Sequence, residues 1–274
     1  MDPSYYYLEM KEHYLNVPYY GSKRRIRVLL PRDYHESDDR YPVVYMHDGQ
    51  NVFHSSEAFS GHSWKIIPTL KRNPDLPPMI IVAIDNSGTD RVDEYTPWSI
   101  TNDAVPEATS SGGLGKDYAK FVMEKVKPFI DEHYRTKSQA KYTAMAGSSL
   151  GGNITAFMGI EYKDEIGGLG VFSLANWITQ PQFDRYIARH ELKPHQRVYI
   201  QVGTKEGDAT DRPFMQGSMR QGYIDTTLKY HHDLLAYGLP LENVSLNIIT
   251  GDTHTESAWA RQIPECLRFL SEEW

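Results

Sequence analysis

Ser149 stands at the centre of the segment Gly147-Ser148-Ser149-Leu150-Gly151, which matches the pattern Gly-x-Ser-x-Gly. A serine in this pattern can act as a nucleophile when the chain turns sharply around it and exposes its hydroxyl. The glycines two residues away on either side allow the close approach that such a turn needs. Ser148 lacks this symmetric pair of glycines, so Ser149 is the better candidate.

The same pattern also fits a glycine- and serine-rich turn without chemistry, and its neighbours decide between the two interpretations. Residues 142–146 are typical of a strand before the serine, and residues 153–162 are typical of a helix after it. A nucleophilic serine requires this strand–turn–helix context. The amino end of the following helix would also place positive dipole where an oxyanion forms. We therefore predict that Ser149 is a nucleophile.

A nucleophilic serine needs a base, and the base needs a carboxylate that orients it. After a serine of this kind, the acid and then the histidine come later in the chain, each on a loop that follows a strand. His254 is the only histidine after Asp233, and it follows the strand predicted at residues 244–249. We predict that His254 is the general base.

The acid has three candidates, Glu206, Asp208 and Asp211, on the loop after the strand predicted at residues 198–202. Glu206 comes soonest after the strand, where a carboxylate can point across the carboxyl edge of the sheet. We therefore prefer Glu206 and interpret the two aspartates as solvated loop residues.

Strand-like and helix-like segments alternate along most of the chain. The runs at residues 43–46 and 79–84 are apolar throughout, as in strands that are covered on both faces. A turn at Gly21-Ser22 separates two earlier strands, at residues 9–17 and 25–30, and predicts a hairpin. The remaining predicted strands are residues 142–146, 169–174, 198–202 and 244–249, and the predicted helices are residues 117–134, 153–162, 221–237 and 257–270.

This alternation predicts an α/β fold with a mostly parallel central sheet, an antiparallel N-terminal hairpin and helices on both faces. The length fits a single domain, residues 1–274, better than two small ones. Pro128 should kink the helix of residues 117–134 or mark its tightening, because it lacks an amide hydrogen. Residues 85–113 show no obvious secondary structure, and a loop of this length is usually functional or mobile.

Composition excludes several classes of protein. Lys and Arg number 29 against 36 Asp and Glu, and the formal net charge of −7 argues against a nucleic-acid partner. No apolar run approaches the ~20 residues of a membrane helix, and the first residues lack the apolar stretch of a signal peptide. Cys266 is the only cysteine, so no internal disulfide can form. We expect a cytoplasmic protein without a membrane partner.

Four segments resemble the putative-esterase family, which includes enterochelin-esterase-like, feruloyl-esterase-like and S-formylglutathione-hydrolase-like enzymes. They are YPVVYMHDGQN at residues 41–51, RVDEYTP at residues 91–97, GSSLGG at residues 147–152 and GTKE at residues 203–206. The resemblance extends from about residue 25 to residue 269. Together the motifs are specific to the family but not to one substrate within it.

The resemblance implies an α/β-hydrolase fold without a large separate lid. It also implies Ser149 as the nucleophile, His254 as the general base and Glu206 as the acid. Many relatives carry Asp at this last position, so Glu206 departs from the family pattern and leaves Asp208 as the second choice.

For the rest of the site, the resemblance implies an oxyanion hole made by the backbone N–H groups of Leu150 and Gln50. The predicted chemistry needs no metal or organic cofactor. The histidines between residues 47 and 62 do not have the spacing of metal ligands. Trp177 follows the strand predicted at residues 169–174, on the active-site side, and is a candidate for lining the substrate pocket.

These features together predict hydrolysis of small-molecule carboxylic esters through an acyl-enzyme. One alternative is an acyltransferase that uses the same three residues, in which an added alcohol would intercept the acyl-enzyme in preference to water. The other is a non-catalytic binding protein that has kept the fold, since a fold alone does not define a function. Siderophore esters, feruloylated or acetylated sugars and short acyl thioesters all remain open as substrates.

Overall fold

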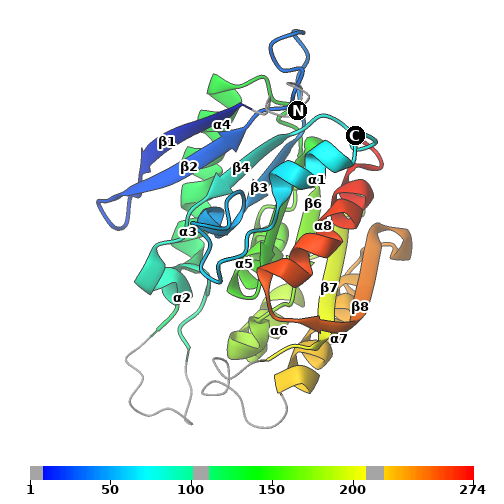
Figure 1. The fold of residues 1–274 in the computed structure, drawn as a ribbon. Helices are drawn as coiled ribbons and strands as arrows, with labels where there is room; N and C mark the ends of the chain where they lie inside the picture. The colour runs from blue at the N-terminus through cyan, green and yellow to red at the C-terminus, as the bar shows by residue number, and fades with distance from the viewer. Residues whose placement is uncertain (1–8, 101–110, 208–218) are drawn as a thin grey trace.

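The computed structural model describes residues 9–100, 111–207 and 219–274, which are built around one eight-stranded sheet (Figure 1). The strands are β1 (Met10–Asn16), β2 (Lys23–Leu29), β3 (Val43–Met46), β4 (Ile80–Ile84), β5 (Thr143–Ser148), β6 (Gly168–Phe172), β7 (Arg197–Lys205) and β8 (Val244–Thr253). Their order across the sheet is β1-β2-β4-β3-β5-β6-β7-β8.

Strand direction divides the sheet into two parts. The pairs from β4 to β8 are all parallel. In contrast, β1 and β2 form an antiparallel hairpin, and β2 pairs antiparallel with β4. The predicted mostly parallel sheet with an antiparallel N-terminal hairpin is therefore confirmed.

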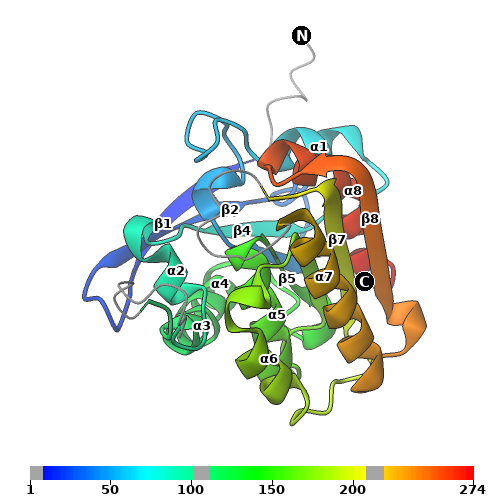
Figure 2. The ribbon, with the colours of Figure 1, turned by 90° about the horizontal axis from the view of Figure 1, so that it is seen from below.

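Helices cover both faces of the sheet, as predicted. They are α1 (Ile66–Arg72), α2 (Arg91–Glu94), α3 (Gly115–Phe121), α4 (Lys127–His133), α5 (Leu150–Glu161), α6 (Gln180–Ile187), α7 (Met219–Ala236) and α8 (Glu256–Ser271). Figure 2 shows α1 and α8 on one face and α5, α6 and α7 on the other. Across the described ranges, no helix is both long and apolar enough to cross a bilayer.

Alternate residues of the central strands face the two helical layers. Val43 and Tyr45 of β3 belong to the core that includes residues of α3 to α7, whereas Val44 and Met46 belong to the core that includes residues of α1 and α8. All residues of β3 and β4 are buried. This explains the continuous apolar runs in the sequence, because a strand covered on both faces has no solvent side.

The helix predicted at residues 117–134 is irregular before its proline. A π-helical turn over Val122–Val126 separates α3 from α4, and Pro128 lies in the first turn of α4. A proline at the start of a helix loses no hydrogen bond, and the wider π turn accommodates its ring. The helix therefore continues through this region, and the irregularity near Pro128 is a wider π turn that precedes the proline.

Three helices, α1, α2 and α6, are absent from the sequence-based prediction. The helix α2 and a 3₁₀ turn at Gly88–Asp90 lie within residues 85–113, so the prediction of no secondary structure there is wrong for residues 88–94. The three helices contain seven, four and eight residues. Segments this short give too few turns for their hydrophobic periodicity to stand out.

The last strand is longer than predicted. It pairs with β7 past an irregularity between Gly203 and Lys205, so that Thr253 lies opposite Lys205. A bulge of this kind bends the strand and redirects the side chains that follow it. As a result, His254 directly follows the end of β8, beside the end of β7.

Candidate active site

Ser149 occupies the sharp turn between β5 and α5. Its backbone angles, φ 58° and ψ −121°, lie in a region that residues other than glycine rarely adopt. The backbone N–H of Ser149 donates to the carbonyl oxygen of Phe172, at the end of β6, at 2.9 Å. A Cβ atom on Gly147 would lie 2.5 Å from the carbonyl oxygen of Gly151, so a larger residue would force the turn apart.

His254 and Glu206 form a hydrogen-bonded pair on the loops after β8 and β7. Nδ1 of His254 lies 2.6 Å from Oε2 of Glu206. Glu206 is fully buried, and 13% of the His254 side chain is exposed. An ionised carboxylate can only accept hydrogen bonds, so Nδ1 carries the hydrogen and Nε2 is left as the basic nitrogen.

The second oxygen of Glu206 is also occupied. Oε1 accepts from the Ser173 hydroxyl at 2.6 Å and from the Gly203 backbone N–H at 2.7 Å. Ser173 in turn accepts from the indole N–H of Trp259 at 2.7 Å. Three donors therefore converge on this buried carboxylate and replace its lost hydration.

Sequence analysis missed Ser173 and the contact made by Trp259. Ser173 follows β6 and Trp259 lies in α8, so only the folded sheet brings them to the acid. A weak signal is the position of Ser173 near the carboxyl end of the strand predicted at residues 169–174, because side chains gather at the carboxyl edge of a parallel sheet.

The segment around Ser173 also connects the pair to Ser149. Phe172 binds the backbone of Ser149, and the next residue, Ser173, binds the side chain of Glu206. Ser149, Glu206 and His254 follow β5, β7 and β8, and all three strands end at the same edge of the sheet. The structure thus brings the three predicted residues to one edge.

Aromatic rings surround His254. The rings of Tyr223 and Trp259 lie 4.8 and 5.1 Å from the imidazole, between centroids. Trp177 meets Tyr223 edge to face at 6.1 Å, and Leu150 packs in the same small cluster. The half-buried Trp177 therefore lies at the edge of the sheet where it was predicted. The ring of Tyr223 lies between it and His254.

The two residues predicted to supply oxyanion donors lie at the ends of neighbouring strands. Leu150 is the first residue of α5, so its N–H has no acceptor within the helix. Gln50 belongs to a 3₁₀ turn, Gly49–Asn51, that follows β3, and β3 pairs directly with β5. Asp48, which directly precedes this turn, has a left-handed backbone conformation with a φ of 53°.

Side chains from two distant segments hold the Gly49–Asn51 turn. The Gln50 amide exchanges two hydrogen bonds with Asn86, of 2.6 and 3.0 Å. Asn86 and Arg91 both bind the carboxylate of Asp48, Arg91 through two contacts of 2.6 and 2.7 Å. The Tyr95 hydroxyl accepts from the Asp48 N–H at 2.9 Å. This network fixes the backbone at Gln50.

His47 precedes this turn and is fully enclosed. Its Nδ1 lies 2.8 Å from the hydroxyl of Tyr118. Burial lowers the pKa of His47 from its ordinary value of 6.5 to about 4, although the nearby Asp48 acts in the opposite direction. His47 is therefore neutral at neutral pH, and protonating it opposes folding.

We expect this histidine to make stability depend on pH. The folded state binds the proton less tightly than the unfolded state, so the stabilisation is complete above pH 6.5 and is lost as the pH falls toward 4. The contribution lost between pH 7 and pH 4.5 is about 2 kcal/mol. Urea unfolding at both pH values should show that His47→Asn loses about 2 kcal/mol less than the wild type over this interval.

The matched control for that measurement is His232→Asn. The His232 side chain is 80% exposed, and its removal should leave the difference between the two pH values unchanged. An equal pH dependence in the wild type and His47→Asn would contradict the assignment of the effect to His47.

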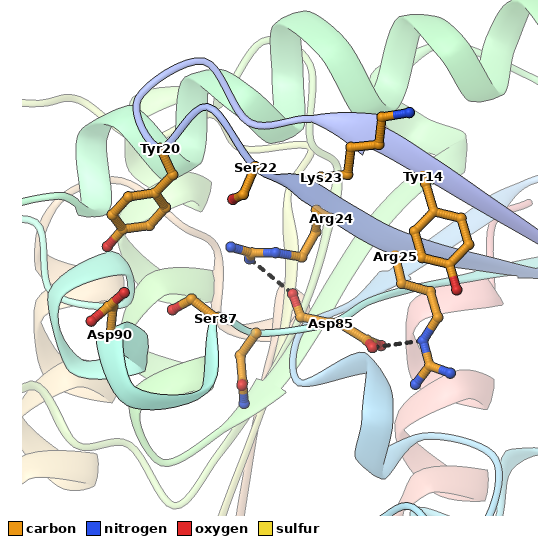
Figure 3. Close-up of a pocket in the computed structure, with 10 residues that line it drawn as sticks. Tyr14, Tyr20, Ser22, Lys23, Arg24, Arg25, Asp85, Ser87 and Asp90 are labelled. Atoms are coloured by element: carbon orange, nitrogen blue, oxygen red, sulfur yellow. Dashed lines mark hydrogen bonds and ion pairs between the residues drawn. The ribbon is translucent and has the colours of Figure 1, made fainter.

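A pocket of about 580 Å³ lies on the far side of the network that holds Gln50 (Figure 3). The hairpin β1–β2 and the segment after β4 line it, and Asn86 is among its walls. Figure 3 shows Asp85 between Arg24 and Arg25, which bind its carbonyl oxygen and its carboxylate. Neither Ser149 nor His254 lines this pocket, so it is separate from the candidate site.

Two other predictions concern the surroundings of the site. Asp208 and Asp211, the alternative acids, lie outside the described residues, and Glu206 is the candidate acid whose contacts the structure gives. Within residues 9–100, 111–207 and 219–274, no group of three or more His, Cys, Asp or Glu side chains is arranged to hold a metal ion.

The parallel sheet, its antiparallel hairpin and the serine turn after β5 define an α/β-hydrolase fold. Residues 18–270 match the family described as "Putative esterase". The chain therefore belongs to this family, in agreement with the resemblance of its motifs.

Three similar proteins illustrate the range of the likeness. The uncharacterized protein YbbA of Bacillus subtilis (strain 168) is 25% identical over 251 residues, which cover 91% of this chain and 93% of that protein. The siderophore hydrolase EstA of Aspergillus nidulans has a TM-score of 0.74 at 16% identity and covers 98% of this chain and 97% of its own. The IroE-like serine hydrolase of Shewanella oneidensis has a TM-score of 0.73 at 17% identity, and the match covers 96% of this chain and 81% of that hydrolase.

Proposed function

We propose that this protein is a serine esterase that hydrolyses small-molecule carboxylic esters through an acyl-enzyme. The observation that carries the proposal is the buried Glu206–His254 hydrogen bond at the same sheet edge as the strained Ser149 turn. Membership of the esterase family supports it, and so does the likeness in fold to a serine hydrolase and a siderophore hydrolase.

In the acylation step, Nε2 of His254 takes the proton of the Ser149 hydroxyl as its oxygen attacks the ester carbonyl carbon. Glu206 keeps the imidazole in the required tautomer and compensates the positive charge that develops on it. The carbonyl oxygen becomes an oxyanion, which the N–H groups of Leu150 and Gln50 stabilise. The carbon–oxygen bond to the alcohol then breaks, and His254 returns the proton to the leaving alcohol.

Deacylation repeats the same steps with water. His254 removes a proton from a water molecule, the hydroxide adds to the acyl carbon, and the bond to Ser149 breaks. The serine oxygen recovers the proton from His254, and the carboxylic acid leaves. The half-buried Trp177 borders this space with apolar surface, which favours an ester with an apolar portion near the histidine.

The proposal predicts a burst of alcohol release when the enzyme is mixed with excess p-nitrophenyl acetate, because acylation releases p-nitrophenol before water frees the serine. The burst should equal about one p-nitrophenolate per enzyme if deacylation is the slower step. Adding methanol should divert part of the acetyl group to methyl acetate, with free acetate as the main product in water. Exclusive transfer to the alcohol would favour an acyltransferase, and a complete lack of ester cleavage would favour a binding protein.

A further inference from the structure

Phe59 presents an almost fully exposed aromatic ring, with 95% of its surface accessible. It belongs to residues 52–65, which connect the Gly49–Asn51 turn to α1. Single apolar residues are common on protein surfaces. The exposure of Phe59 alone therefore does not indicate a function, and the contacts that fix its backbone are the relevant evidence.

The first contact that fixes this loop is made by Glu57, two residues before Phe59. Glu57 binds the guanidinium of Arg27 at 3.1 Å, and the same guanidinium donates to the carbonyl oxygen of Gly49 at 2.6 Å. Arg27 is 1% exposed, which makes it a rigid bridge. Glu57 also binds Arg25 at 2.8 Å. The segment before Phe59 is thus attached to the turn that contains Gln50.

The second set of contacts begins with the backbone of Phe59 itself. The backbone N–H of Phe59 donates to Oδ1 of Asn51 at 3.0 Å, and the Asn51 amide donates to Oε1 of Glu256 at 3.2 Å. The hydroxyl of Ser60 donates to the other oxygen of Glu256. Asn51 and Glu256 are both buried. These bonds attach Phe59 to the residue after Gln50 and to the residue two after His254.

The loop is therefore held on both sides by the two segments that carry the oxyanion donor and the base. A loop held this firmly could carry any small polar residue at this position, yet it projects a phenyl ring into solvent from a backbone that is bonded to the neighbours of Gln50 and His254. Binding residues are commonly found on loops that a rigid scaffold positions in this way.

We propose that Phe59 contacts the substrate, and that the preferred substrates carry a flat apolar group beyond the ester linkage. This inference rests on the proposed esterase function. A bound ester would cover the ring, and the burial of apolar surface would strengthen substrate binding. Because the ring touches a part of the substrate away from the reacting atoms, it should affect KM more than kcat.

The test compares Phe59→Ala with the wild type on 2-naphthyl acetate, ethyl naphthylacetate and ethyl acetate, with acid release followed by titration at constant pH. The first ester places the flat group on the alcohol side and the second places it on the acyl side. Phe59→Ala should lower kcat/KM about fivefold for at least one naphthyl ester, mainly through KM, as expected for losing a small apolar contact. Ethyl acetate should change less than about twofold.

Leu241→Ala is the matched control, because Leu241 is also exposed, at 66%, but precedes β8 at the opposite edge of the sheet. It should leave all three esters unaffected. Equal kinetics of Phe59→Ala and the wild type on both naphthyl esters would overturn the role of Phe59 while leaving the esterase function intact. Failure of the wild type to cleave any of the three esters would overturn both.

Discussion

Ser149→Ala is expected to lower kcat for ester hydrolysis about 10³-fold or more while the protein stays folded. The variant removes the only oxygen that can form the acyl-enzyme in the proposed mechanism. It should not release strain or add any, because alanine and serine both carry a Cβ atom at the φ of 58° that this position adopts. Initial rates on p-nitrophenyl acetate, together with urea unfolding curves, separate loss of chemistry from loss of fold.

Ser148→Ala is the appropriate control for this variant. Ser148 is the preceding residue, carries the same hydroxyl and is buried at 4% exposure. We expect it to retain turnover close to that of the wild type. Full activity of Ser149→Ala would contradict the assignment of Ser149 as the nucleophile. The same holds if a folded Ser148→Ala variant is inactive while Ser149→Ala is active.

The second large effect is expected for Glu206→Gln, which should lower kcat by about 10²- to 10⁴-fold. Glutamine keeps the shape of the side chain, and its oxygen can still accept from Ser173 and Gly203. Its amide would then face Nδ1 of His254 and donate to it, in place of the present 2.6 Å contact with a carboxylate. The hydrogen of the imidazole would move to Nε2, which could no longer accept the serine proton.

Asp208→Asn, a change two residues further along the chain, serves as the control and should have little effect on kcat. The opposite pattern, an active Glu206→Gln enzyme and an inactive Asp208→Asn enzyme, would assign the acid role to Asp208. Thermal unfolding of both variants should accompany the kinetics, because Glu206 is fully buried and its donors need an acceptor.

Much of the fold could be predicted because the relevant signals are local. The run Val43–Met46 coincides with β3, since every one of its residues faces a buried layer. The strand–turn–helix around Ser149 depends on glycines that lie within a few residues, and Gly147 shows the physical need in its 2.5 Å approach to Gly151. Positions after strands indicated Glu206 and His254, because parallel strands deliver their carboxyl ends to one edge.

The rest of the site could not be predicted because it depends on pairs of residues that are far apart in the chain. Trp259 donates to Ser173, 86 residues earlier in the chain, and Ser173 donates to Glu206. Asn51 and Glu256 meet across 205 positions to hold Phe59. No spacing or periodicity connects such residues, and each of them has an ordinary polar or aromatic type with many other uses.

The most direct test of the account is the intact mass of the protein after incubation with a fluorophosphonate, for the wild type, Ser148→Ala and Ser149→Ala. The proposed mechanism predicts one adduct on the wild type and on Ser148→Ala, and none on Ser149→Ala, because the reagent reacts with a serine that a base has activated. An unmodified wild type that is folded, or a Ser149→Ala variant that is modified equally fast, would contradict the claim that Ser149 is an activated nucleophile.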